Sequence, residues 1–155
     1  MPDRASAYPE ARRQLIAFLE ANGYSTHPNE VFCPSGQHCW VDVAAVKGQD
    51  YWAFEYKSRR DSMRRGLEQC QSYANAFNYV VLVADRDRVT SSPYFTQFSR
   101  QGFGIWRHDG TRFFAIVSPK RKAAVSRAKA VVEKQFTRIR KRKNTNYVSL
   151  STWLR

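Results

Sequence analysis

Cysteine is scarce in this sequence: Cys33, Cys39 and Cys70 are the three among 155 residues. Three cysteines cannot form a fully paired disulfide framework, which excludes the class of small secreted proteins held together by disulfides and favours a reducing compartment. The segment CPSGQHC brings Cys33, His38 and Cys39 close together, with His27 upstream, but no second cysteine pair follows it. A structural zinc site normally has that second pair, so we expect free thiols here.

Long hydrophobic runs are also missing. No apolar stretch approaches the roughly 20 residues needed to cross a bilayer, and the N-terminal segment MPDRASAYPEARRQL lacks the apolar core of a secretory signal. We therefore expect an intracellular, cytoplasmic protein without a membrane partner. Hydrophobic residues make up 43% of the chain and aromatic residues 14%, which is enough for one folded domain with a sizeable core.

Acidic residues are few, above all towards the C-terminus. The chain has 26 basic and 13 acidic residues, a net charge of +13, and from Pro119 onward there are twelve Lys or Arg and a single acid, Glu133. We predict a near-neutral α/β core over residues 1–118, with a basic C-terminal helix and tail over 119–155, within a single domain. Such a segment is typical of a protein that binds a polyanion, most commonly nucleic acid. A merely solvated basic face is the alternative.

The hydrophobic pattern predicts strands that alternate with helices after an initial meander. Helices are predicted over residues 8–22, 61–77, 94–100 and after Pro119, and strands over 24–32, 39–46, 51–57 and 79–85, with a hairpin over 104–117 that turns at Asp109-Gly110. The pattern makes no prediction for residues 144–155. This order favours an α/β layered domain with a mixed sheet.

Two acids and a lysine interrupt the apolar strands 39–46 and 51–57. The segment KGQD joins these strands, and Gly48 as the first residue of a two-residue turn is the type II′ signature. Paired residue numbers then sum to 97, which places Asp42 opposite Glu55 with Cβ atoms about 4.5–5.5 Å apart. Lys57 projects from the same face. The other face carries the apolar residues Val41, Val43, Trp52, Phe54 and Tyr56.

Directly opposed carboxylates destabilise a sheet, and burial increases the cost. Either one carboxyl is protonated, or the face is wet, or a cation lies between the two acids. Trp40, Ala44 and Ala53 share the face, which indicates that it is largely covered. Because Mg²⁺ prefers oxygen ligands and binds through one or two carboxylates, the spacing predicts a metal site. A surface salt bridge between Asp42 and Lys57 is the alternative.

Asp42, then twelve residues, then Glu55-Tyr56-Lys57 resembles the catalytic signature of the PD-(D/E)XK nuclease superfamily. In the next predicted helix Gln69 and Tyr73 form Q-x3-Y, which is similar to the motif that follows the E-x-K strand in the RecB-type branch. An upstream acidic helix is similar to that of archaeal Holliday-junction resolvases. The resemblance covers roughly residues 8–85, and it departs from the family where Val41 stands in place of the name-giving proline.

The resemblance implies a restriction-endonuclease-like three-layer core, α-β-β-β-α-β around a central mixed sheet, followed by the basic C-terminal helix. It further implies that Asp42 and Glu55 hold Mg²⁺, for which Mn²⁺ substitutes, with Glu10 and the backbone carbonyl of Tyr56 as further ligands; Glu20 is the reserve for Glu10. Lys57 would orient the attacking water or stabilise the transition state, with Gln69 and Tyr73 completing the catalytic set.

The function expected from these residues is metal-dependent hydrolysis of phosphodiester bonds in DNA, duplex or branched, by an endonuclease of the kind found in repair and recombination. A junction-selective version would act as a homodimer. The predicted contacts to the phosphate backbone are Arg59, Arg60, Arg64, Arg65, Arg127, Lys134, Arg138, Arg140, Lys141, Arg142 and Lys143. Arg107, His108 and Arg112 are further candidates for contact with DNA, and His108 is also a candidate general base. The alternatives are a non-catalytic nucleic-acid-binding module with the same fold and a ribosome-associated or RNA-binding protein.

Overall fold

The structure is a computed structural model that describes the backbone of residues 4–34, 39–89 and 93–153, and the side chains of residues 8–34, 39–88 and 93–139. These residues form a mixed α/β structure with five helices and a central sheet that has both parallel and antiparallel strand pairs. The predicted α/β class and mixed sheet are therefore confirmed.

Six strands form the central sheet, in the spatial order β1-β4-β5-β6-β7-β8. Their bounds are β1 (Ser25–Thr26), β4 (Val43–Lys47), β5 (Asp50–Lys57), β6 (Tyr79–Asp85), β7 (Gly104–Asp109) and β8 (Arg112–Val117). The three central strands β5, β6 and β7 run parallel to one another, whereas β1, β4 and β8 pair antiparallel. A separate two-stranded sheet pairs β2 (Val31–Cys33) with β3 (Cys39–Val41).

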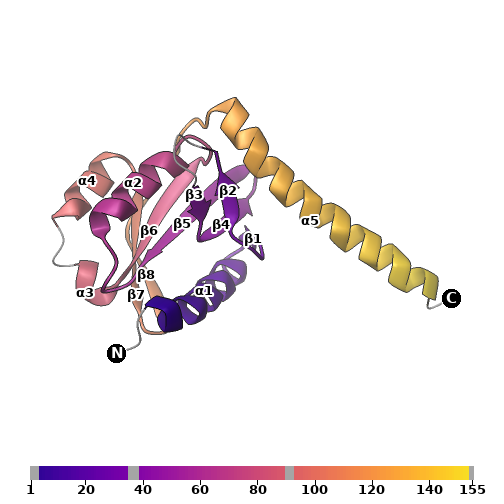
Figure 1. The fold of residues 1–155 in the computed structure, drawn as a ribbon, viewed down its shortest axis with the longest axis horizontal. Helices are drawn as coiled ribbons and strands as arrows, with labels where there is room; N and C mark the ends of the chain where they lie inside the picture. The colour runs from indigo at the N-terminus through magenta and orange to yellow at the C-terminus, as the bar shows by residue number, and fades with distance from the viewer. Residues whose placement is uncertain (1–3, 35–38, 90–92, 154–155) are drawn as a thin grey trace.

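Helices cover both faces of the central sheet (Figure 1). On one face α1 (Arg4–Ala21) packs Leu15 and Leu19 against apolar residues of β4, β5 and β6. On the other face lie α2 (Met63–Tyr73) and α4 (Tyr94–Arg100), whose Leu67 and Phe98 belong to a second core. Because successive strand residues point to opposite faces, the continuous apolar run of β6 supplies both cores. The short helix α3 (Arg86–Val89), which was not predicted, follows β6 directly.

The last helix, α5 (Ser126–Trp153), has two parts. Ala128, Val132 and Phe136, near its start, are buried in the core on the α2 side, as the predicted apolar stripe requires. Val125, which was placed on the same stripe, precedes the helix and is 55% exposed. Further along, α5 leads away from the rest of the molecule (Figure 1), and it includes most of residues 144–155, for which no structure was predicted. In the part of the chain that the structure describes, no helix combines the length and apolarity that a bilayer crossing needs.

The local sequence pattern predicted most helices and strands near their observed positions. The observed β6 and α4 have the predicted bounds, and α1 ends just before Gly23, whose φ of +87° is the left-handed conformation expected after a helix. Two predictions for strands were wrong in detail. The predicted strand 24–32 divides into β1 and β2, which belong to different sheets, and the predicted strand 39–46 divides at Asp42 into β3 and β4.

Candidate functional site

Glu55 and Lys57 lie near the carboxyl end of β5 and point towards α2. Both are almost fully buried, at 1% and 3% exposed, and Lys57 Nζ is 3.3 Å from Glu55 Oε1. From α2, the hydroxyl of Tyr73 donates a hydrogen bond of 2.7 Å to Glu55 Oε2. The Lys57 side chain runs past Gly66, where an added Cβ would lie 3.1 Å from Lys57 Cε. The structure thus brings together three of the predicted catalytic residues.

Asp42 lies at the point where the chain leaves the central sheet. The β4–β5 register runs from Val43 opposite Phe54 to Lys47 opposite Asp50, which confirms the predicted sum of 97, and Gly48 has the positive φ of the predicted turn. At Asp42 the backbone N–H of Tyr56 donates to the side-chain Oδ2 at 2.9 Å. The Asp42 carboxylate therefore accepts the hydrogen bond from Tyr56 that a backbone carbonyl of a neighbouring strand would otherwise accept.

Two predictions were wrong because the predicted strand is interrupted between β3 and β4. Beyond this interruption, β3 turns to pair with β2, so Val41 packs in the core on the α2 side and not beside Val43. For the same reason Trp40, which was expected on a covered face with Ala44 and Ala53, is 55% exposed, whereas the two alanines are buried. Asp42 itself is 5% exposed.

Helix α1 fixes Asp42 from the other side. The Tyr8 hydroxyl donates to Asp42 Oδ1 at 2.9 Å, and Arg12 Nε donates to the backbone carbonyl of Asp42 at 3.0 Å. Burial, followed by the charge of Asp42, raises the pKa of Tyr8, so this phenol stays a donor. Sequence reasoning missed both residues. The one signal present was their i,i+4 spacing, which places them on one face of a helix.

Burial and the neighbouring Asp42 raise the pKa of Glu55 to about 8, although Lys57 and the hydrogen bond from Tyr73 act in the opposite direction. Burial and the charge of Glu55 also raise the pKa of Tyr73. The Tyr73 hydroxyl lies 3.1 Å from the carbonyl oxygen of Trp40 as well. A protonated Glu55 can therefore donate to Tyr73, which in turn donates to Trp40, so the hydrogen bonds are satisfied in either protonation state.

The donor set fits a divalent cation. In the described part of the chain no three His, Cys, Asp or Glu side chains form a metal-binding group, so a site here would have two carboxylates, those of Asp42 and Glu55. Gln69, which follows Gly66 and precedes Tyr73 along one side of α2, has a buried Oε1 without a hydrogen-bond partner. Two carboxylates that repel each other and a buried amide oxygen without a hydrogen-bond partner are hard oxygen donors. Mg²⁺ needs one or two carboxylates and keeps several waters, so these residues suit it.

Glu10 does not join the pair. Its side chain is 57% exposed and forms an ion pair with Arg13, which lowers the pKa of Glu10. The reserve candidate, Glu20, accepts a hydrogen bond from the Thr26 hydroxyl. The prediction of Glu10 as a metal ligand is not supported, because Arg13 at i+3 captures its carboxylate while α1 presents Tyr8 and Arg12 to Asp42.

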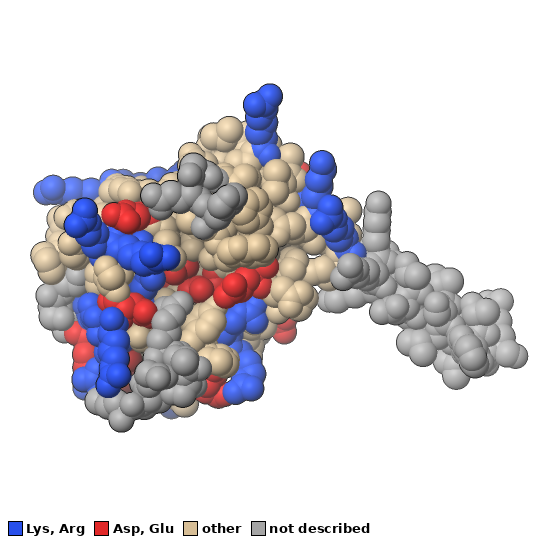
Figure 2. Space-filling model, viewed as in Figure 1, with Lys and Arg blue, Asp and Glu red and all other residues tan. Residues whose placement is uncertain are grey.

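The predicted phosphate contacts beside the site are exposed arginines, some of which have acidic partners. Arg59 lies 2.7 Å from Asp87 and Arg64 lies 3.5 Å from Glu68. Basic side chains gather over α2, α3 and α4 and along the first part of α5 (Figure 2). Also exposed are Arg60, Arg65, Arg127, Lys134 and Arg138. Arg140, Lys141, Arg142 and Lys143 belong to α5, but their side chains lie outside the described residues.

His108 lies on the α1 side of the sheet, away from Glu55. It is 6% exposed, its ring stacks on Phe113, and its Nε2 is 2.9 Å from Gln14 Oε1. Burial lowers its pKa. His108 is therefore a packed core histidine in this structure, and it is not placed as a general base beside the acids.

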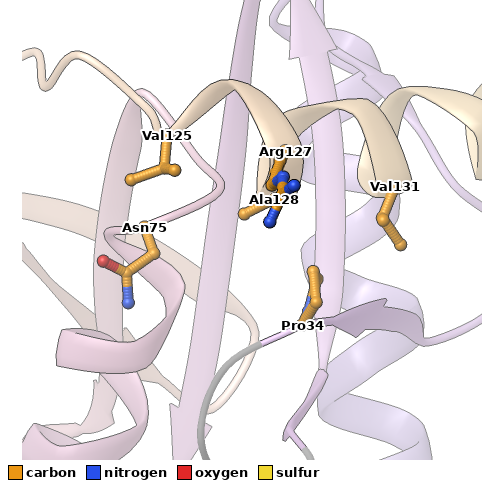
Figure 3. Close-up of a pocket in the computed structure, with 6 residues that line it drawn as sticks. All are labelled: Pro34, Asn75, Val125, Arg127, Ala128 and Val131. Carbon is orange, nitrogen blue, oxygen red and sulfur yellow. The ribbon is translucent and has the colours of Figure 1, made fainter.

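A cavity of about 400 Å³ lies apart from the acids (Figure 3). It is bounded by the start of α5, the residues after α2 and the residue after β2. Its lining residues are Pro34, Asn75, Val125, Arg127, Ala128 and Val131. None of the predicted catalytic residues lines it, so buried charge and not cavity shape identifies the candidate site.

Comparisons with known proteins identify a family and a fold. The family model described as "Bacteriophage P4 protein cII" matches residues 4–148. A protein of unknown function from Silicibacter pomeroyi has a similar structure, with a TM-score of 0.63 and 17% identity over 91% of this chain and 90% of that chain. An XisH family protein from Nostoc punctiforme has a TM-score of 0.52 and 16% identity over 66% of this chain and 94% of that chain. At these identities the similarity shows the fold alone, and a comparison with curated protein sequences finds no match.

Proposed function

This chain belongs to the family of bacteriophage P4 protein cII, and we propose that it is a metal-dependent nuclease of the PD-(D/E)XK type that hydrolyses phosphodiester bonds in DNA. The observation that carries the proposal is the burial of Asp42, Glu55 and Lys57 in one group, at 5%, 1% and 3% exposed. Buried charges are costly, and replacing a buried ion pair by well-packed apolar residues is often neutral or stabilising, so their presence favours a functional role over a structural one.

The arrangement of the elements supports the same class. Helix α1 lies on one face of the sheet and α2 on the other, with the antiparallel pair β4–β5 followed by α2 and the parallel strand β6. This order is compatible with the restriction-endonuclease-like α-β-β-β-α-β core. In that core the strand pair carries the acids. Here β5 carries Glu55, and Asp42 immediately precedes β4.

We assign Asp42 and Glu55 to hold one Mg²⁺ or Mn²⁺ ion, and we propose the buried, unpartnered amide oxygen of Gln69 as a further ligand. The bound ion supplies a Lewis acid that offsets negative charge on the phosphate oxygens. Tyr8 and the N–H of Tyr56 hold the Asp42 carboxylate in one orientation, and Tyr73 does the same for Glu55. Such fixed orientation is what positioning in catalysis requires.

Lys57 supplies positive charge to the proposed site. Its ammonium group offsets the charge of Glu55, with Nζ 3.3 Å from Oε1. A cation bound to both acids would release Lys57 from that role, and Lys57 would then stabilise charge on the phosphate or orient the attacking water. Exposed arginines around α2 and α3 and the basic face of α5 would hold the DNA backbone.

A cleavage assay tests this function. Plasmid, junction and single-stranded DNA are incubated with the protein in Mg²⁺ or in EDTA, and the products are resolved on a gel. We expect cutting only with metal, and a loss of at least about a hundredfold in rate for Lys57→Ala and Asp42→Ala. DNA binding should persist in both variants. Glu10→Gln, which changes an exposed acid of α1, is the matched control and should cut at the wild-type rate. Binding by the wild type without cutting of any substrate would instead indicate a non-catalytic nucleic-acid-binding module.

A further inference from the structure

Trp40 is an unusual exposed residue. Trp is a large apolar side chain that is highly buried on average, yet Trp40 is 55% exposed. Its neighbour across the β2–β3 pair is Phe32, and the two ring centroids are 5.4 Å apart. The exposed aromatic Phe114 differs, because the guanidinium group of Arg107 lies over its ring at 4.6 Å. Trp40, in contact with the half-buried Phe32, thus places an exposed aromatic surface on the two-stranded sheet.

This surface is directly connected to the acidic pair. Trp40 precedes Asp42 by two residues, and its backbone carbonyl is 3.1 Å from the Tyr73 hydroxyl that also contacts Glu55. The break at Asp42 turns β3 out of the central sheet and thereby exposes the indole. The same local feature therefore positions one acid and presents one aromatic ring.

Positive charge flanks the aromatic surface. Helix α5 lies along β2, because the Gln135 side chain accepts a hydrogen bond from the Phe32 N–H at 2.9 Å and donates one to the Phe32 carbonyl at 2.8 Å. Lys134 and Arg138, next to Gln135 on the helix, are exposed. Figure 2 shows basic side chains along this part of α5. An aromatic ring beside exposed cations is the combination that binds single-stranded nucleic acid, because bases stack on the ring and cations contact the phosphates.

We propose that Trp40, supported by Phe32, is a stacking site for an unpaired nucleobase, with Lys134 and Arg138 contacting the adjoining phosphates. The substrate class is then DNA with a single-stranded or unpaired segment next to the bond that is cut. The position of the unpaired segment next to the cut rests on the proposed function. The binding of the base rests on the aromatic and charged residues alone.

The test measures binding without cleavage. Fluorescence anisotropy in EDTA compares a labelled single strand with the corresponding full duplex, for the wild type, Trp40→Ala and Trp40→Tyr. We expect Trp40→Ala to weaken single-strand binding about tenfold and to leave duplex binding unchanged. Trp40→Tyr keeps an aromatic ring and should bind within about twofold of the wild type. Phe114→Ala, which changes an exposed aromatic on β8, at the edge of the central sheet, is the matched control and should bind normally.

Two results would overturn the inference. One is equal binding of the single strand by the wild type and Trp40→Ala. The other is a wild-type dimer in sedimentation velocity that Trp40→Ala dissociates, since the surface would then serve a second copy of the chain. A wild type that cuts no DNA in Mg²⁺ would remove the proposed nuclease function, while the anisotropy result would still decide whether Trp40 binds an unpaired base.

Discussion

At the scale of single residues, Glu55 is the clearest departure from a packed core. It is 1% exposed, and its neighbours on the same face of β4, β5 and β6 are Ala44, Ala53 and Leu82, all fully buried. An apolar residue would fill this position at lower cost. The hydrogen bond from Tyr73 and the ion pair with Lys57 reduce that cost without removing it, since the pKa of Glu55 remains raised.

The raised pKa predicts a dependence of stability on pH. The pKa of Glu55 is raised from 4.5 to about 8 in the folded protein, so its contribution to the free energy of unfolding is fully present below pH 4.5 and is lost as the pH rises through about 8. A cation that binds the ionised form compensates for this loss. Differential scanning calorimetry should therefore show that Mg²⁺ raises Tm more at about pH 9 than at about pH 6. Glu55→Gln should abolish the difference, and equal Mg²⁺ effects at both pH values in the wild type would contradict the prediction.

Gly66 offers a test of how tightly Lys57 is positioned. Ala is favoured over Gly in a helix by about 0.5–1 kcal/mol, but a Cβ at position 66 would lie 3.1 Å from Lys57 Cε. We expect Gly66→Ala to displace the ammonium group and lower the cleavage rate about tenfold without weakening DNA binding in EDTA. Ser72→Ala, a change at a half-buried position on the same helix, is the control. Cleavage by Gly66→Ala at the wild-type rate would show that the close approach has no role.

At this scale strand alternation, a local rule, predicted that Glu55 and Lys57 share a face, and the family resemblance assigned Tyr73 to the same site. Tyr8 and the exposure of Trp40 were not predictable in the same way. Each depends on where the chain bends at Asp42, which is determined by a hydrogen bond between side chain and backbone. The prediction of Glu10 rests on the family resemblance, which does not take into account that the neighbouring Arg13 forms an ion pair with Glu10.

At the scale of elements, the division between β3 and β4 determines the site. The segment CWVDVAAVK is an apolar run with one acid, and its pattern predicts a single strand. The structure ends β3 at Val41 and starts β4 at Val43, so the two parts join different sheets. By contrast, β6 and α4 were predicted with their observed bounds, because each is a short continuous pattern flanked by polar residues.

One side chain of α5 forms hydrogen bonds with the backbone of β2. Gln135 forms two hydrogen bonds with the backbone of Phe32, as a neighbouring strand would. Replacement by Leu should leave the Phe32 N–H and carbonyl without these partners and cost about 1–3 kcal/mol in the free energy of unfolding, measured in urea. Amide hydrogen exchange at Phe32 should become faster. Thr137→Ala, an exposed change two residues along α5, serves as the control, and unchanged protection of the Phe32 amide in the Leu variant would refute this role of Gln135.

At the scale of the whole molecule, positive charge is concentrated at one end of the chain. Residues 1–118 carry fourteen basic and twelve acidic residues, so nearly all of the net charge of +13 comes from residues 119–155. The basic helix starts from the core, next to the aromatic surface of β2 and β3. The sequence predicted this division of charge but not the direction of α5, which depends on Ala128, Val132 and Phe136 packing against the core.

The charge predicts how DNA binding depends on salt. Each phosphate contact that is lost should reduce the slope of log K against log salt by about 0.9 on duplex DNA. The double variant Lys134→Gln, Arg138→Gln should therefore lower the slope by about 2 relative to the wild type. Arg121→Gln is the control, because Arg121 is paired with Asp50 at 3.0 Å. An unchanged slope in the double variant would show that α5 does not contact the DNA backbone.

The most direct test of the proposed site is a crystal structure of the protein grown with Mn²⁺, read by anomalous scattering. We expect one strong peak within coordination distance of the carboxylates of both Asp42 and Glu55, with the Lys57 ammonium group moved away from Glu55. Asp42→Asn crystals should lack the peak. No peak at these two acids in the wild type, or a Lys57–Glu55 ion pair that persists with Mn²⁺ bound elsewhere, would contradict the metal site on which the nuclease function depends.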